Sequence, residues 1–166
     1  MKQKPYVLQV CGLKNTGKTT FMNGFIAFLK ENGYAVGTIK HDGHEFETSH
    51  QKEDNFQHYH SGANTSIVFS NGQYLCIQRE KKELSELIQQ LQNMDIILIE
   101  GCKNEAYPKV ELLRKGVSEY PVSNPVQRLA CIVDESYEVE EKFIKKEDPK
   151  LFQKVFELLC VQNKKR

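Results

Sequence analysis

The stretch VCGLKNTGKTTF, residues 10–21, combines glycine, lysine and threonine in a way that neither a strand nor a helix interior favours. It matches G-x-x-x-x-G-K-[ST], the phosphate-binding pattern of a P-loop, without a gap. The apolar run before it predicts a strand over 6–11, and the apolar residues at helical spacing after it predict a helix over 19–33. Because a P-loop requires this strand and helix on either side, we interpret the stretch as a P-loop rather than a glycine turn that matches by chance.

The P-loop residues have distinct expected roles. The glycines let backbone N–H groups curve around a phosphate, and the N-terminus of the helix adds partial positive charge. Lys18 can reach the terminal phosphate, and the Thr19 hydroxyl can ligate Mg²⁺. The pattern therefore predicts a nucleoside triphosphate site. The residues of the motif are Gly12, Leu13, Lys14, Asn15, Thr16, Gly17, Lys18 and Thr19.

A second carboxylate is needed to hold the metal ion. The apolar run at 96–100 predicts a strand buried on both faces, and it ends in Glu100 at the edge that would open toward the phosphates. Glu100 would reach Mg²⁺ through a water molecule or act on the attacking water; the alternative is that it only ends a buried strand. Asp42, after a predicted strand over 35–40, is a further metal candidate, or an ordinary loop acid. The catalytic candidates are thus Lys18 and Glu100, and the metal candidates are Thr19, Glu100 and Asp42.

All five histidines lie in one polar segment, residues 41–62. The segment lacks apolar periodicity and is predicted to be a long functional or mobile loop with room for a short helix. No cysteine accompanies the histidines, and their spacing defines no helical face. Solvated histidines, or donors to an anionic ligand, are therefore favoured over a transition-metal site. They are His41, His44, His50, His58 and His60.

The order of the remaining elements predicts an α/β protein. A strand, a loop, a helix and a second strand open the chain, and this βαβ unit implies a parallel sheet. Two apolar runs joined by Asn-Gly predict a β-hairpin over 65–78. We therefore expect a P-loop NTPase-like three-layer fold with a mainly parallel sheet and an added β-hairpin, as one domain over 1–166. Further predicted elements are helices over 82–94 and 148–160, the latter capped by Asp148 with Pro149 first, and strands over 109–114 and 129–134.

Composition limits the partners. The 166 residues include 23 Lys and Arg and 22 Asp and Glu, and the resulting net charge of +1 gives no reason to expect nucleic acid or an anionic membrane. No apolar run approaches the roughly 20 residues that span a bilayer, and no signal-like segment precedes the P-loop, so we expect a cytoplasmic protein. The five cysteines show no CxxC spacing and are interpreted as reduced and mostly buried.

Several blocks of the sequence resemble the MobB family of molybdopterin-guanine dinucleotide biosynthesis adapter proteins. They are GLKNTGKTT, VGTIKHDGHEFE, the SGA at 61–63 and, above all, DIILIEGCKNEAYPKVELLR at 95–114. The resemblance implies a GTP-binding homodimer with weak GTPase activity and Mg²⁺. It implies that this homodimer assists the molybdenum cofactor guanylyltransferase, which attaches GMP to molybdopterin. By position, Thr20 would join the phosphate-binding residues, Lys103 would lie near the nucleotide or the partner, and His41, Asp42 and His44 would form a switch-like loop.

Two other classes of protein stay open. A small-molecule or nucleotide kinase shares the P-loop and the parallel sheet, but such enzymes use several arginines to hold phosphoryl groups. This chain has four arginines, none of them in the histidine-rich segment. A nucleotide-responsive interaction module would instead use binding to order residues 41–62 for a partner. No N/T-K-x-D element for guanine recognition is present, so the residues alone do not choose GTP over ATP.

Overall fold

The computed structural model describes residues 4–42, 54–118, 120–134 and 142–164. The chain divides into two compact units, Met1–His41 with Leu87–Arg166, and Asp42–Glu86. The single domain over 1–166 stays a prediction.

The first unit is built on a six-stranded sheet in the order β2-β5-β1-β6-β7-β8. Every neighbouring pair in this sheet is parallel, as the βαβ pattern predicted. Parallel strands end at a common edge, so the residues that follow β1, β2 and β5 emerge on the same side. The three-residue β8 was not predicted, because so short a strand leaves no pattern in the sequence. The strands are β1 Tyr6–Cys11, β2 Val36–Lys40, β5 Ile96–Glu100, β6 Lys109–Leu113, β7 Arg128–Val133 and β8 Phe143–Lys145.

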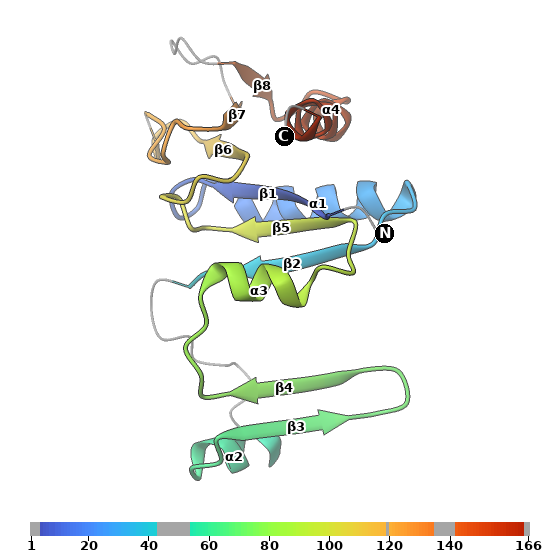
Figure 1. Cartoon of the computed structure of the whole chain (residues 1–166). Coiled ribbons are helices and arrows are strands. Elements are labelled where there is room, and N and C mark those ends of the chain that lie inside the picture. The colour runs from blue at the N-terminus through green and yellow to red at the C-terminus, as the bar shows by residue number, and fades with distance from the viewer. Residues whose placement is uncertain (1–3, 43–53, 119, 135–141, 165–166) are drawn as a thin grey trace. The chain divides into compact units, whose positions relative to one another are not determined.

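Helices α1 (Lys18–Glu31) and α4 (Leu151–Asn163) pack together on one face of the sheet (Figure 1). Each helix buries apolar residues at a spacing of four, and these residues form the main core with alternate side chains of the strands. Gly24 permits the close approach of the two helices, because a Cβ there would lie 2.5 Å from the ring of Phe152. The buried helical residues include Phe21, Phe25, Leu29, Leu151, Val155 and Leu159.

The end of α3 (Leu84–Gln90) lies against the opposite face of the sheet. Leu91 and Met94, just after α3, lie within 3.0 Å of the position that a Cβ of Gly37 would occupy on β2. Ile97 and Ile99 of β5 point to this face and are fully buried. Helices thus cover both faces of a mainly parallel sheet, which confirms the predicted fold class, although α3 is shorter than the helix predicted over 82–94.

The start of α4 corrects one prediction. The helix begins at Leu151 rather than at Pro149, and Lys150 is its N-cap residue. Asp148 instead closes the preceding turn: its Oδ1 accepts the Lys150 N–H at 2.8 Å, and its main-chain oxygen accepts the Leu151 N–H at 2.9 Å. The predicted cap was therefore wrong by two residues, because the aspartate stabilises a turn before the helix.

The second unit contains α2 (Asp54–His60) and the antiparallel pair β3 (Thr65–Phe69) and β4 (Tyr74–Gln78). The predicted hairpin is confirmed. The short helix falls within the segment 41–62, where room for one was expected. Its contact with the hairpin includes a hydrogen bond of 2.8 Å from the Ser66 hydroxyl to the carbonyl of Asn55. His44 and His50 lie outside the described residues.

The cysteines only partly match expectation. All five are free thiols, as predicted. Cys11 and Cys131 are buried, Cys102 and Cys160 are half-buried, and Cys76 is exposed on β4, so the expectation that most are buried was wrong. In the described part of the chain, no helix is both long and apolar enough to cross a membrane.

Candidate functional site

The P-loop connects β1 to α1 and has a left-handed backbone at three positions. Gly12, Asn15 and Gly17 have φ of 136°, 66° and 93°. At Gly12, a Cβ would lie 2.6 Å from the carbonyl oxygen of Leu112 and 2.8 Å from the Thr16 hydroxyl. Only glycine fits that position, which explains the first residue of the motif in physical terms.

The carbonyl groups early in the loop are engaged by side chains of the loop itself. The Lys18 ammonium donates to the carbonyl oxygens of Gly12 and Leu13, at 3.0 and 2.7 Å. The hydroxyl of Thr16, which is fully buried, donates to the Leu13 oxygen at 2.9 Å. These bonds keep the ammonium of Lys18 at the loop, where a bound phosphate would attract it. Thr19 and Thr20 are exposed in the first turn of α1.

Glu100 lies at the edge of the sheet from which the P-loop emerges. It is the last residue of β5 and is aligned with Val10 of β1, two residues before Gly12. The carbonyl of Glu100 accepts the His41 N–H at 3.0 Å, so the exit of β2 is tied to the same place. The structure therefore brings together the strand ends that were predicted to meet. A role of Glu100 toward a metal ion stays a prediction.

The described contacts say less about two other predicted site residues, Lys103 and Asp42. Lys103 is exposed in the loop after β5, and its carbonyl accepts the Asn124 N–H at 3.0 Å. Asp42 is exposed and begins the second unit. Over the described ranges, no group of three or more His, Cys, Asp and Glu residues could hold a metal ion. The roles of Lys103 and Asp42 stay predictions.

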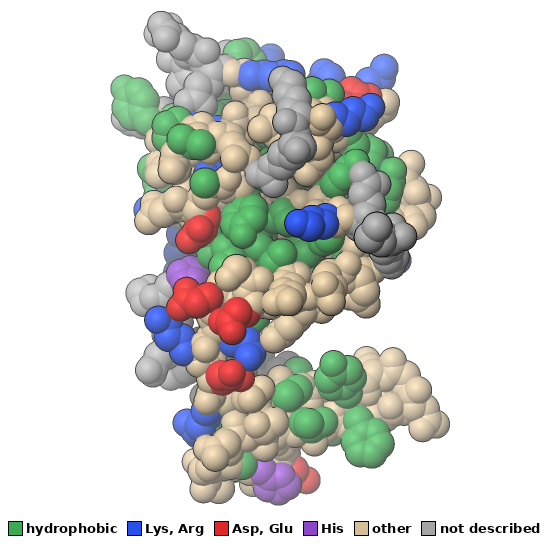
Figure 2. All heavy atoms as spheres, viewed as in Figure 1, with side chains coloured by type: hydrophobic (Ala, Val, Ile, Leu, Met, Phe, Trp, Pro, Cys, Tyr) green, Lys and Arg blue, Asp and Glu red, His purple; other side chains and the backbone are tan. Residues whose placement is uncertain are grey.

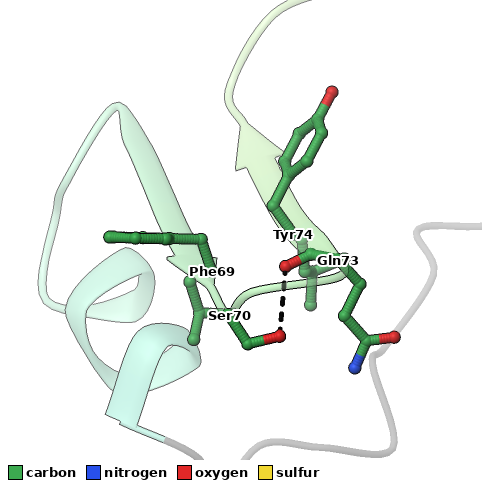
Figure 3. A pocket seen from close by; sticks show the side chains of 6 residues that line it. Phe69, Ser70, Gln73 and Tyr74 are labelled. Carbon is green, nitrogen blue, oxygen red and sulfur yellow. Dashed lines mark hydrogen bonds between the residues drawn. The ribbon is translucent and has the colours of Figure 1, made fainter.

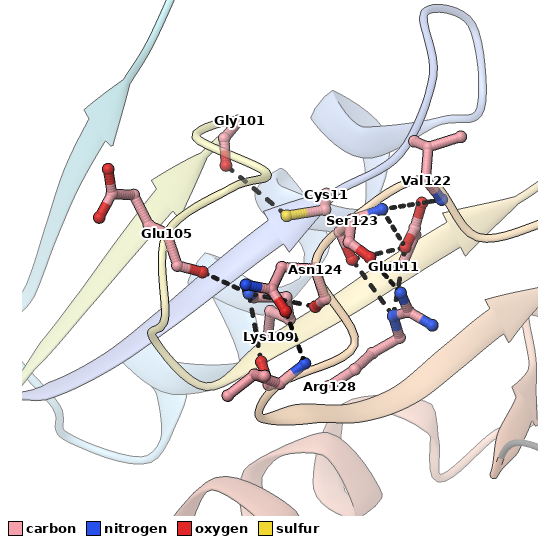
Figure 4. A network of polar contacts seen from close by, with 10 residues as sticks. Cys11, Gly101, Glu105, Lys109, Glu111, Val122, Ser123, Asn124 and Arg128 are labelled. Carbon is pink, nitrogen blue, oxygen red and sulfur yellow. Dashed lines mark hydrogen bonds and ion pairs between the residues drawn. The ribbon is translucent and has the colours of Figure 1, made fainter.

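A buried ionic network lies beneath the loops next to the site (Figure 4). Glu111 of β6 is fully buried and accepts hydrogen bonds from the N–H of Val122 at 2.6 Å and from the Ser123 hydroxyl at 2.6 Å. Glu111 also pairs with a cation. Arg128 Nε lies 3.3 Å from the Glu111 carboxylate, and the arginine side chain is only 5% exposed. The carboxylate is thus satisfied on all sides, as a buried charge requires.

Two further side chains hold the loop that follows Glu100. The Lys109 ammonium donates to the carbonyls of Glu105 and Val126, and burial lowers the pKa of this lysine. Gln9 of β1 donates Nε2 to the carbonyl of Cys102 at 2.8 Å. Lys109 and Glu111 come from the PKVE part of the block that resembled MobB. In this structure, their side chains hold the backbone of the loops next to the P-loop.

Burial, followed by the nearby Glu111 carboxylate, raises the pKa of Cys11 from 9.0 to about 11. The folded chain therefore keeps the Cys11 thiol proton at pH values where the unfolded chain loses it. The protonated thiol's contribution to the free energy of unfolding is present below about pH 9 and is lost as the pH rises toward 11. Relative to Cys11→Ala, the free energy of unfolding of the wild type should fall by about 2 kcal/mol over that interval. Urea denaturation across this pH range measures it. Cys76→Ala, at an exposed position, is the matched control, and parallel curves for the wild type and Cys11→Ala would contradict the prediction.

Two cationic residues at the P-loop were missed by sequence reasoning. Arg114, after β6, donates Nη1 to the carbonyl of Asn15 at 3.1 Å. Lys146, after β8, donates Nζ to the carbonyl of Thr16 at 3.1 Å. They lie 99 and 130 residues from their partners along the chain, and no local pattern marks them.

This sheet, with its glycine loop between β1 and α1, defines the class of protein as a P-loop NTPase-like fold. The family model MobB, described as Molybdopterin guanine dinucleotide synthesis protein B, matches residues 7–135. The chain therefore belongs to the MobB family, and the resemblance seen in the sequence is confirmed.

Relatives in two bacteria are similar over much of the chain. The "Probable molybdopterin-guanine dinucleotide biosynthesis adapter protein" of Bacillus subtilis (strain 168) is 35% identical over 111 residues, which span 64% of this chain and 64% of that protein. The adapter protein of Escherichia coli (strain K12) is 28% identical over 128 residues, 74% of this chain and 73% of that one. The crystal structure of Bacillus subtilis MobB superposes with a TM-score of 0.75 at 28% identity, covering 92% of this chain and 96% of the other.

Proposed function

We propose that the chain is a GTP-binding adapter with weak GTPase activity in the biosynthesis of molybdopterin-guanine dinucleotide. In this role it would assist the molybdenum cofactor guanylyltransferase as that enzyme attaches GMP to molybdopterin. The observation that supports the proposal best is the P-loop itself, with its left-handed glycines and Lys18 in place. The names of the relatives supply the pathway, and the loop supplies the chemistry of nucleotide binding.

The residues of the loop fit a nucleoside triphosphate with Mg²⁺. Backbone amides along the motif would bind the phosphates, Lys18 would neutralise their charge, and Thr19 with Glu100 would hold the metal ion. The Mg²⁺ ion, when bound, supplies charge neutralisation at the phosphate oxygens. Lys103 would lie near the nucleotide or the partner. Asp42 would serve the metal or report the nucleotide state to the partner.

Slow hydrolysis is consistent with the residues that follow Glu100. They are Gly101, Cys102 and Lys103, and none is a ready general base near neutral pH. Burial raises the pKa of Cys102, which disfavours a thiolate there. An adapter that binds GTP and turns it over slowly agrees with this composition better than an efficient enzyme does.

The contacts of two arginines do not favour the kinase alternative. Arg128 is paired with Glu111 inside the protein, and Arg79 donates to the Tyr59 carbonyl and stacks at 4.1 Å over the Tyr59 ring. These two side chains are committed to structural contacts. A kinase would need several arginines directed at transferring phosphoryl groups.

A calorimetric titration tests the proposal. The purified chain is titrated with non-hydrolysable GTP and ATP analogues, each with and without Mg²⁺. Selective, Mg²⁺-dependent binding of the GTP analogue is expected. Preference for the ATP analogue, or equal affinity for both, would contradict the adapter proposal and favour a kinase.

We also propose that the chain forms a homodimer through the hairpin of the second unit. One face of the hairpin presents Ile67, Phe69 and Tyr74, whose exposed fractions are 59%, 82% and 76%. Val68 and Leu75, paired on the other face, are 45% and 43% exposed. Four of these side chains, Val68, Phe69, Tyr74 and Leu75, line a groove at the hairpin (Figure 3), and hydrophobic atoms gather over the hairpin in the space-filling view (Figure 2). A two-stranded hairpin that exposes several large apolar side chains gains stability when they are covered, and a second copy of the chain would cover them.

Replacement of Phe69 by aspartate should convert the dimer to a monomer, because a carboxylate would have to be desolvated at the interface. Analytical ultracentrifugation of both proteins measures the change. Lys81→Asp provides the control, since it introduces the same carboxylate at an exposed position beyond the hairpin. A wild-type monomer, or a Phe69→Asp variant that sediments as the wild type does, would contradict the proposed interface.

A further inference from the structure

The P-loop receives hydrogen bonds from two residues that follow other strands of its sheet: β6, which neighbours β1, and β8 at the sheet's edge. Arg114 follows β6 and donates to the Asn15 carbonyl, and Lys146 follows β8 and donates to the Thr16 carbonyl, each at 3.1 Å. Lys146 is half-buried, and its own main-chain N–H donates to the carbonyl of Val133 at 2.7 Å, which anchors it to the end of β7. Neither residue belongs to the P-loop motif.

These bonds act on the orientation of individual peptide groups. In a trans peptide, the carbonyl of one residue and the N–H of the next point in opposite directions. When Arg114 holds the Asn15 carbonyl, the N–H of Thr16 is turned to the other side of the loop. Lys146 does the same for the N–H of Gly17 through the carbonyl of Thr16. An anion needs the N–H groups to converge and the carbonyls to point away, and this is the orientation that the two cations support.

The backbone at this point needs such support. Asn15 is in the left-handed region, where residues other than glycine are rare, and Gly17 is left-handed as well. Gly17 also makes room for the lysine: a Cβ there would lie 3.0 Å from Lys146 Nζ and 3.4 Å from its Cε. Lys18 and Thr16 donate to the carbonyls before Lys14, and Arg114 and Lys146 donate to those after it. Hydrogen-bond donors therefore hold the loop carbonyls on both sides of Lys14.

We propose that Lys146 and Arg114 are positioning residues of the nucleotide site, which keep the amides of Thr16 and Gly17 oriented for phosphate. The inference rests on the proposed function, because it assigns these residues to the binding of a nucleotide by the P-loop. Their effect passes through the phosphate-binding amides and does not involve the base. The loss of either residue therefore weakens the binding of GTP and GDP by a similar factor.

Lys146→Met provides the main test, because methionine keeps the length and packing of the side chain but cannot donate. Its Kd for Mg²⁺·GTP is expected to rise roughly tenfold, as for a lost charged hydrogen bond, and Lys146→Arg should recover most of the loss. Lys145→Met is the matched control: this neighbouring β8 residue is exposed and its removal costs the same charge, so its Kd should stay within about twofold of the wild type. Arg114→Gln, at an exposed hydrogen bond, should raise the Kd about threefold.

The midpoint of thermal unfolding without nucleotide separates positioning from stability. A positioning role predicts that Lys146→Met keeps this midpoint while its stabilisation by added GTP shrinks. If the wild type binds GTP and both Lys146→Met and Arg114→Gln bind it equally well, the inference is overturned and the proposed function stands. If the wild type binds no nucleotide, the proposed function and the inference fail together. If Lys146→Met does not fold, the Arg114→Gln comparison decides.

Discussion

Replacement of Lys18 by alanine is expected to weaken the binding of Mg²⁺·GTP by roughly 100-fold. The ammonium would lose its charge-assisted hydrogen bonds to the phosphates, which are the stronger kind of hydrogen bond in proteins. In the structure, the Lys18 ammonium donates hydrogen bonds to the Gly12 and Leu13 carbonyls of its own loop. We therefore expect the fold to remain intact and the effect to appear in affinity rather than in stability.

The measurement is a titration of the variant with the GTP analogue, together with its thermal unfolding. Lys30→Ala is the matched control, because Lys30 is an exposed lysine near the end of the same helix. It should leave the affinity unchanged. Equal affinity of Lys18→Ala and the wild type would show that the loop is not the nucleotide site.

Replacement of Glu111 by alanine is expected to lower the free energy of unfolding by about 3–5 kcal/mol, since it removes the carboxylate that balances the buried charge of Arg128. Arg128 would keep its charge inside the protein, at 5% exposure. The N–H groups of Val122 and Ser123 would also lose their acceptor in a buried place. This variant should show the largest loss of stability among those considered.

Urea denaturation measures the loss, with Glu147→Ala as the control because Glu147 is an exposed glutamate in the same unit. A double variant, Glu111→Leu with Arg128→Met, removes both charges and should recover part of the stability. If Glu111→Ala were as stable as the control, the buried network would not contribute to the fold. If the double variant were less stable than Glu111→Ala, the loss would come from packing rather than from the missing counter-charge of Arg128.

Local patterns predicted those parts of the fold in which each residue depends on its near neighbours. The hairpin over 65–78 followed from the Asn-Gly turn, and α1 followed from its apolar spacing. Errors arose where the same local signal has two outcomes. Asp148 has the features of a helix cap but closes a turn two residues early. The strand over 109–114 was predicted, but nothing in its local pattern indicated that the charged Lys109 and Glu111 would be fully buried. Burial of charge depends on partners that other segments provide.

The sequence by itself determined the P-loop conformation, because the loop's glycines and hydroxyls act on the backbone within a few residues of themselves. It also determined the alternation of strands and helices around that loop. Only the tertiary structure decided which distant side chains reach the loop. Arg114 and Lys146 lie at the ends of β6 and β8, and the order of the strands in the sheet brings them to the carbonyls of Asn15 and Thr16. Contacts of this kind depend on the assembled sheet, so no pattern along the chain contains them.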